Sequence, residues 1–167
     1  MNNSFKPIPL LFTLLLLQVF VLNNVLFLGY INPYIYIAFV FLYPLKENRF
    51  AFLLYSFLLG LIIDFFSDSG GIHAFSTLLI AYIRLFFIRL YFRKVAADYP
   101  FFSLKSESFG KVFNYTVTLT LIHHFTYFTF ANFSLENFNN VILNTLFSSI
   151  FTLLLYFLGT YIFSKTK

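Results

Sequence analysis

The chain has 167 residues, of which 60% are hydrophobic and 10% are charged, against about 25% charged residues in an ordinary soluble domain. So few charges cannot cover a solvated surface, which excludes a soluble globular protein and predicts an all-α integral membrane protein with a single polytopic domain over 1–167. Cysteine is absent, which excludes disulfides and thiolate metal sites, and the net charge of +5 is attributed to membrane topology rather than to nucleic-acid binding.

Polar breaks divide the apolar sequence into six predicted membrane spans. In chain order these lie near 8–22, 33–45, 50–65, 72–91, 112–130 and 141–163. The first follows a lysine but lacks a small-residue cleavage site, so we expect an uncleaved span rather than a signal peptide. The second is shorter than the roughly 20 residues that cross a bilayer vertically. Either its start reaches back to Leu26, or the membrane thins around it.

The basic residues fall on one side of this predicted topology. When successive breaks are assigned alternately to the two sides of the membrane, every Lys and Arg except Arg84 lies on the same side. Basic residues in short loops mark the cytoplasmic side, so both termini are expected in the cytoplasm. The longest break, 93–111, mixes Lys and Arg with Tyr and Phe. We expect it either to lie among lipid headgroups or to be a solvated loop whose aromatic side chains fold back on the bundle.

The third span carries a stripe of small residues that ends in an acid. Ser56, Gly60 and Asp64 follow one another at steps of four, which lets a neighbouring helix approach closely. Asp64 lies at the C-terminal end of its own helix, where the macrodipole disfavours a carboxylate. Two hypotheses follow: a hydrated acid at the outer interface, or an acid that accepts hydrogen bonds from a neighbouring helix or a partner.

The fourth span carries a narrow face of small residues that ends in an arginine. Its members are Ala74, Thr77, Ala81 and Arg84. Arg84 is therefore expected to point towards protein, and to snorkel to the cytoplasmic interface or bind a lipid phosphate or a partner carboxylate. It lies about 20 Å along the helix from Gly71, which disfavours a direct pair with the acid of the third span.

Hydrogen-bonding side chains form stripes along the last two spans. The fifth carries Thr116, Thr120, His123, His124 and Tyr127, and the sixth carries Asn144, Ser148, Thr152 and Tyr156. Their expected role is to hold helices together, at roughly 0.6 kcal/mol per contact. The histidines lack the spacing of helical metal ligands, so neither a metal nor another cofactor is expected. No nucleophile or acid–base motif is present, which predicts a protein without enzymatic activity.

Several of these residues occur in an order that resembles one protein family. They are Gly60-Leu-Ile-Ile-Asp64, a short loop, Gly71-Ile-His-Ala74 and Ala81-Tyr82, with Gln18, Pro33 and Pro44 as further points of agreement. With them the chain resembles MreD, the rod shape-determining membrane protein of bacteria, over nearly its whole length. Within the loop, Gly70 aligns as well as Gly71 does.

The resemblance implies a non-enzymatic scaffold in the bacterial cytoplasmic membrane, within the machinery that elongates the cell wall. Its implied partners are membrane lipids, the membrane-anchored MreC, the actin-like MreB and the glycosyltransferase–transpeptidase pair that makes peptidoglycan. The implied fold is similar to the substrate-binding S-components of energy-coupling-factor vitamin transporters. The alternative function is that of such an S-component, but the first alanine is Ala38, so the alanine pair that docks those subunits is missing from the first span.

Overall fold

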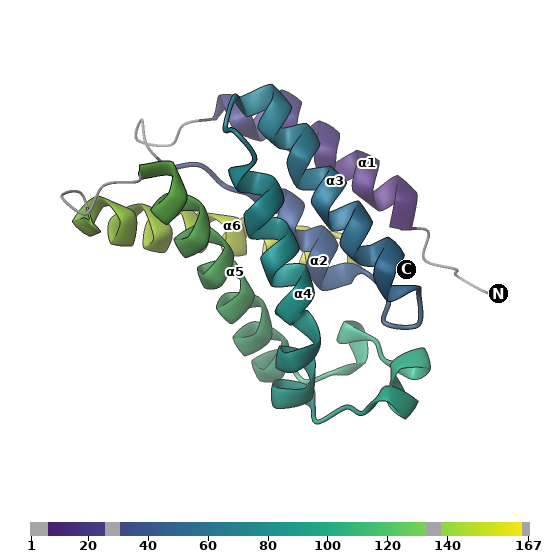
Figure 1. Cartoon of the computed structure of the whole chain (residues 1–167). Helices are drawn as coiled ribbons and strands as arrows, with labels where there is room; N and C mark the ends of the chain where they lie inside the picture. The colour runs from purple at the N-terminus through teal and green to yellow at the C-terminus, as the bar shows by residue number, and fades with distance from the viewer. Residues whose placement is uncertain (1–6, 26–30, 133–137, 165–167) are drawn as a thin grey trace.

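Helices make up nearly all of the described chain, which comprises residues 7–25, 31–132 and 138–164 of a computed structural model (Figure 1). The long helices are α1 (Pro7–Leu16), α3 (Arg49–Ser67), α4 (Ile72–Phe92), α5 (Phe109–Asn132) and α6 (Phe138–Ser164). The short ones are η1 (Leu17–Val21), η2 (Leu22–Asn24), η3 (Ile35–Ile37), α2 (Ala38–Leu42), η4 (Ala96–Phe101) and η5 (Leu104–Ser106). No strand occurs in those three ranges, so the predicted all-α class is confirmed there.

Four helical segments of the described chain are long and apolar enough to cross a membrane. They are Pro7–Asn24, Arg49–Ser67, Ile72–Phe92 and Phe138–Ile162. The first reaches this length because a turn of π-helix (η1) and a turn of 3-10 helix (η2) continue α1. The fifth predicted span, 112–130, is helical within α5, but its Thr, His and Asn residues keep its hydropathy below that of the four.

The turn between α3 and α4 is built from residues that adopt left-handed backbone conformations. Asn48 precedes α3 as its N-cap, and its Oδ1 accepts the N–H groups of Phe50 and Ala51 in the first turn. After α3, Asp68, Gly70 and Gly71 have φ values of 50°, 64° and 93°. Glycine adopts positive φ without strain, so this pair of glycines lets the chain reverse over a few residues. α3 and α4 therefore form an antiparallel hairpin (Figure 1).

The predicted second span, 33–45, differs from a membrane-crossing helix. Its helical part covers only 35–42, in η3 and α2. Pro33 precedes this helical part and Pro44 follows it. The residue before a proline avoids the helical conformation. Tyr43, which precedes Pro44, accordingly has an extended ψ of 130° and ends the helix. Every side chain from Tyr34 to Phe41 is buried. This central segment, residues 31–43, contacts α1, α4 and α6 and does not face lipid as a separate helix.

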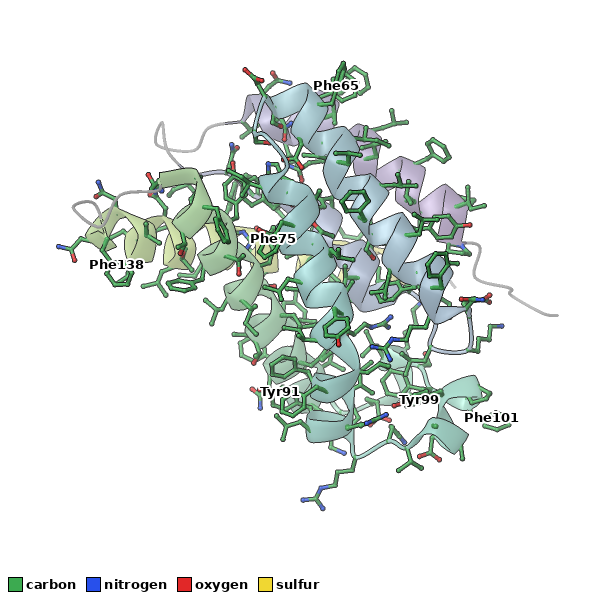
Figure 2. All side chains as sticks on the ribbon, viewed as in Figure 1. Phe65, Phe75, Tyr91, Tyr99, Phe101 and Phe138 are labelled. Atoms are coloured by element: carbon green, nitrogen blue, oxygen red, sulfur yellow. The ribbon has the colours of Figure 1, made fainter. Side chains whose placement is uncertain are left out.

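The surface of the described bundle is apolar. Many large hydrophobic residues expose more than half of their surface, among them Phe12, Phe20, Phe65, Phe86, Leu154 and Leu158. Figure 2 shows Phe65 and Phe138 projecting away from their helices. Such a surface suits contact with lipid, because no water is available there to solvate polar groups. The described turn 43–48 and the segment 93–108 lie at one end of the bundle, and the α3–α4 turn lies at the other (Figure 1).

The segment between α4 and α5 combines features of both interpretations of the 93–111 break. The ring of Phe102 packs on that of Phe92 with 5.2 Å between centroids, and the hydroxyl of Tyr99 accepts a hydrogen bond from Nε of Arg89. These aromatic residues fold back on the bundle. Phe101, in contrast, is 89% exposed and points outward (Figure 2). Glu107 joins the two ends of the segment through ion pairs with Lys94 and Lys111.

Candidate functional site

The C-terminal half of α3 contacts the first turn of α4 through backbone atoms. A Cβ atom placed on Gly60 would lie 2.5 Å from Cα of Ala74 and 2.7 Å from the carbonyl oxygen of His73. Carbon atoms in contact lie about 3.5–4.0 Å apart, so a side chain does not fit at this position. Gly60 therefore permits the close approach of α3 and α4.

Asp64 lies one helical turn beyond Gly60 and binds the free N–H groups at the start of α4. Its Oδ1 accepts the N–H of His73 at 2.9 Å, and its Oδ2 accepts the N–H of Ala74 at 2.8 Å. The hydroxyl of Ser69 donates to Oδ1 at 2.6 Å. The carboxylate thus neutralises the positive end of the α4 macrodipole while it is buried. We call these five residues the α3–α4 clasp.

The clasp distinguishes between the two hypotheses for Asp64. The carboxylate accepts hydrogen bonds from a neighbouring helix, and it is only 5% exposed rather than hydrated. The macrodipole of α3, the helix that carries Asp64, disfavours the carboxylate, but the macrodipole of α4 outweighs it, because the N–H groups of α4 point at the acid. Gly71, at the N-cap of α4, supplies the left-handed turn that brings these groups into place.

Tyr36 of the central segment joins a histidine of α4 to a histidine of α5. Its hydroxyl lies 2.8 Å from Nδ1 of His73 and 2.8 Å from Nε2 of His123. A phenol both donates and accepts, so it can donate to one imidazole while it accepts from the other. The ring of Tyr127 stacks on His73 with 4.4 Å between centroids. Because His73 also belongs to the clasp, these hydrogen bonds connect the clasp to the centre of the bundle.

His124 connects α5 to α6 and to the central segment. Its Nδ1 lies 2.9 Å from the carbonyl oxygen of Thr120, which can only accept, so Nδ1 carries the hydrogen. Its Nε2 then accepts from the hydroxyl of Thr152 at 3.1 Å. The same hydroxyl oxygen accepts the N–H of Tyr34 at 2.9 Å. A neutral imidazole satisfies all three hydrogen bonds. We call Tyr34, Tyr36, His73, His123, His124 and Thr152 the histidine cluster.

Arg84 of α4 caps the C-terminal end of α2. Its Nη2 donates to the carbonyl oxygen of Phe41 at 3.2 Å and to that of Tyr43. Its Nε donates to the hydroxyl of Tyr115 at 3.1 Å. The guanidinium carbon lies 5.0 Å from the centroid of the Phe52 ring, within cation–π range. The cation thus faces carbonyl groups at the negative end of a helix.

The position of Arg84 corrects one expectation from the sequence. The side chain is 2% exposed, so it does not snorkel to the interface but lies inside the bundle, where the C-terminal carbonyls of α2 accept its hydrogen bonds. No ion pair joins it to an acid in the described part of the chain. Asp64 and Arg84 therefore bind two different helix ends.

The remaining predicted residues line helix contacts to different degrees. Ser56 and Ala81 are buried, and the Ser56 hydroxyl donates to a carbonyl oxygen of its own helix. Thr120 and Ser148 are buried, but their hydroxyls make no hydrogen bond within the described chain. Asn144 is half-buried. Of the polar stripe on α6, it is Thr152 that makes a hydrogen bond to α5, through His124.

Sequence reasoning missed the tyrosines of the central segment. Tyr34 and Tyr36 lay in the predicted second span, 33–45, and were not assigned a polar role. A second missed contact joins residues already noted in the resemblance: Nε2 of Gln18 donates to the carbonyl oxygen of Pro33 at 3.0 Å. The flanking prolines were the available signal, because a stretch that they restrict to eight helical residues is too short to cross a membrane as a helix.

Comparison of the chain with protein-family models, with curated proteins and with solved structures finds no match. Among the described residues, no group of three or more His, Asp or Glu side chains is placed to hold a metal ion. Within the candidate site, buried polar side chains bind the ends of helices and one another.

Proposed function

We propose that this chain is an MreD-like scaffold of the machinery that elongates the bacterial cell wall, in the cytoplasmic membrane. The α3–α4 clasp carries this proposal. Gly60, Asp64 and Ala74 belong to the pattern on which the resemblance to MreD rests, and these residues are in direct contact with one another. Residues that hold two helices in a fixed position suit a protein whose task is to present a rigid surface to partners.

The chemistry of the buried polar groups supports a scaffold. The carboxylate of Asp64 and the guanidinium of Arg84 each bind backbone groups, and Nδ1 of His124 faces a carbonyl oxygen. Groups held in this way order helices and are poorly placed to transfer protons to a substrate. The proposed partners are an MreC-like bitopic protein, MreB and the peptidoglycan glycosyltransferase–transpeptidase pair.

The proposal includes a topology with both termini in the cytoplasm and six crossings, one of them by the central segment. The chain has no cysteine, so single cysteines can report the side on which a residue lies. In intact cells an impermeant maleimide should label Asn139→Cys, at the outer start of α6, and should label Ser106→Cys only after permeabilisation. Labelling of Ser106→Cys in intact cells would contradict this orientation.

Depletion of the protein in its native bacterium tests the function. Rod-shaped cells should become round, and plasmid-borne wild-type protein should restore the rods. A variant with the exposed substitution Lys105→Gln should restore them equally, whereas Gly60→Leu should fail and should no longer co-purify with the MreC-like partner. Depleted cells that stay rod-shaped, with growth that depends on an added vitamin, would instead assign the transporter class.

A further inference from the structure

The charge of Arg84 has no acidic partner within the described chain. An arginine has five N–H groups, and the bonds from Nε and Nη2 to Phe41, Tyr43 and Tyr115 use three of them. The two N–H groups of Nη1 donate no hydrogen bond to a described residue. A buried cation without an anion is unfavourable in a medium of low dielectric constant. An anion close to Nη1 would remove this penalty.

A cavity of about 140 Å³ lies beside this guanidinium. A single water molecule needs about 10–15 Å³ of cavity volume measured in this way, so the cavity has room for a tetrahedral anion. Its lining comprises Tyr43, Pro44, Leu45, Glu47, Arg49, Phe52, Ala81, Arg84, Leu85 and Tyr99. We call it the Arg84 cavity. It lies where the turn after α2, the start of α3 and the segment 93–108 meet α4, and Figure 2 labels Tyr99 in that segment.

The charges around the cavity favour an anion over a cation. Arg49 is a second guanidinium in the lining, and Lys46 follows Leu45 in the same turn. Glu47 is the acid of the lining; it is exposed and makes no ion pair with either arginine. Arginine binds phosphate particularly well, because its planar fork matches two oxygen atoms at once. The buried end of the cavity therefore suits a phosphate group.

The rest of the lining fits the part of a lipid that follows its phosphate. Pro44, Leu45 and Phe52 offer an apolar wall. The exposed rings of Phe50 and Tyr82 belong to residues that directly follow two lining residues in sequence. The segment 93–108 at the same end carries Phe101, whose exposed ring suits the headgroup layer. We propose that the Arg84 cavity binds the phosphate group of an anionic membrane lipid. The inference goes beyond the proposed scaffold function and stands independently of it.

Binding can be measured on delipidated protein in a non-ionic detergent by thermal unfolding and by native mass spectrometry. Phosphatidylglycerol should raise the melting temperature in a saturable manner and remain bound in the mass spectrum, because a ligand of the native state stabilises it. Phosphatidylcholine should produce neither effect. Equal stabilisation by the two lipids would overturn the proposal. Equal stabilisation by inorganic phosphate at the same concentration would assign the cavity to free phosphate and would also overturn it.

Substitutions locate the effect. Arg49→Gln removes an exposed cation of the lining and should raise the half-saturating concentration of phosphatidylglycerol about tenfold, the scale of one charge-assisted hydrogen bond. Lys105→Gln removes the same charge outside the lining and should leave binding unchanged. Arg84→Lys keeps the charge but loses the fork, so a folded variant should also bind more weakly. Wild-type binding by Arg49→Gln, or saturation only by an acidic peptide, would contradict lipid binding in this cavity.

Discussion

Replacing Gly60 by alanine should separate α3 from α4, although it adds only one methyl group. The new Cβ would lie 2.5 Å from Cα of Ala74, so the helices must part by about 1 Å to reach a normal carbon–carbon distance. The neighbours are backbone atoms, and no rotamer change relieves the contact. A shift of this size would lengthen the hydrogen bonds that His73 and Ala74 donate to Asp64, now 2.8–2.9 Å, to about 3.8 Å, beyond hydrogen-bonding range.

The expected loss of stability follows from these two effects. Overpacking costs about 1–3 kcal/mol, and each hydrogen bond to a charged group contributes about 1.5–3 kcal/mol. Alanine recovers about 0.5–1 kcal/mol through its helix propensity. Since the clash can relax partly without breaking both bonds, we expect Gly60→Ala to lower the free energy of unfolding by about 2–4 kcal/mol.

Reversible unfolding by sodium dodecyl sulfate in mixed micelles, followed by tyrosine fluorescence, measures this loss. The matched control is Gly159→Ala in α6, where the added Cβ would meet no atom within 4 Å apart from its chain neighbours and the backbone of its own helix, so its stability should stay the same or rise. If Gly60→Ala is as stable as Gly159→Ala, the close approach of α3 and α4 is not a property of the folded protein, and the argument from the clasp fails.

Three further substitutions test the other buried bonds in the same assay. Asp64→Asn puts an N–H₂ group where two N–H donors need acceptors, and it should lower the free energy of unfolding by about 2–4 kcal/mol. In the double variant with Gly60→Ala, the total loss of stability should be smaller than the sum of the two single losses. Full additivity would show that the two residues act separately. Tyr36→Phe should cost about 1–3 kcal/mol, because it leaves two buried imidazole nitrogens unpaired, whereas a neutral effect would contradict the bridge. Thr152→Val should cost a similar amount, about 1–3 kcal/mol, while Thr160→Val, at an exposed site of the same helix, should change stability little.

Apolar patterning sufficed to predict most of the helices. Runs of Phe, Leu and Ile between polar breaks placed five of them close to their observed positions, as in 50–65 for α3 and 72–91 for α4. For the central segment, hydropathy predicted a span over 33–45 but not its burial inside the bundle, because hydropathy does not distinguish lipid from a protein interior: both environments select apolar side chains. Pro33 and Pro44 limit its helix to eight residues, and that restriction, rather than hydropathy, distinguishes it from a helix long enough to cross a membrane.

Contacts within the site could be predicted only where two residues share a helix. The stripe of Ser56, Gly60 and Asp64 follows from helical periodicity. The groups that bind Asp64 belong to the backbone of α4, and the periodicity of α3 does not predict where that backbone lies. The bond of Tyr36 to His123 joins residues 87 positions apart. Such a contact depends on how the helices pack, so periodicity along a single helix carries no information about it.

Asp64 and Arg84 show how this bundle holds two opposite charges inside without pairing them. Each charge lies at the helix end of opposite polarity: the carboxylate at the N-terminus of α4, and the guanidinium beside the last carbonyls of α2. Both oxygens of the carboxylate accept hydrogen bonds, since three donors reach them. The guanidinium keeps two N–H groups without a described acceptor. This asymmetry is the reason for proposing a ligand beside Arg84 and none beside Asp64.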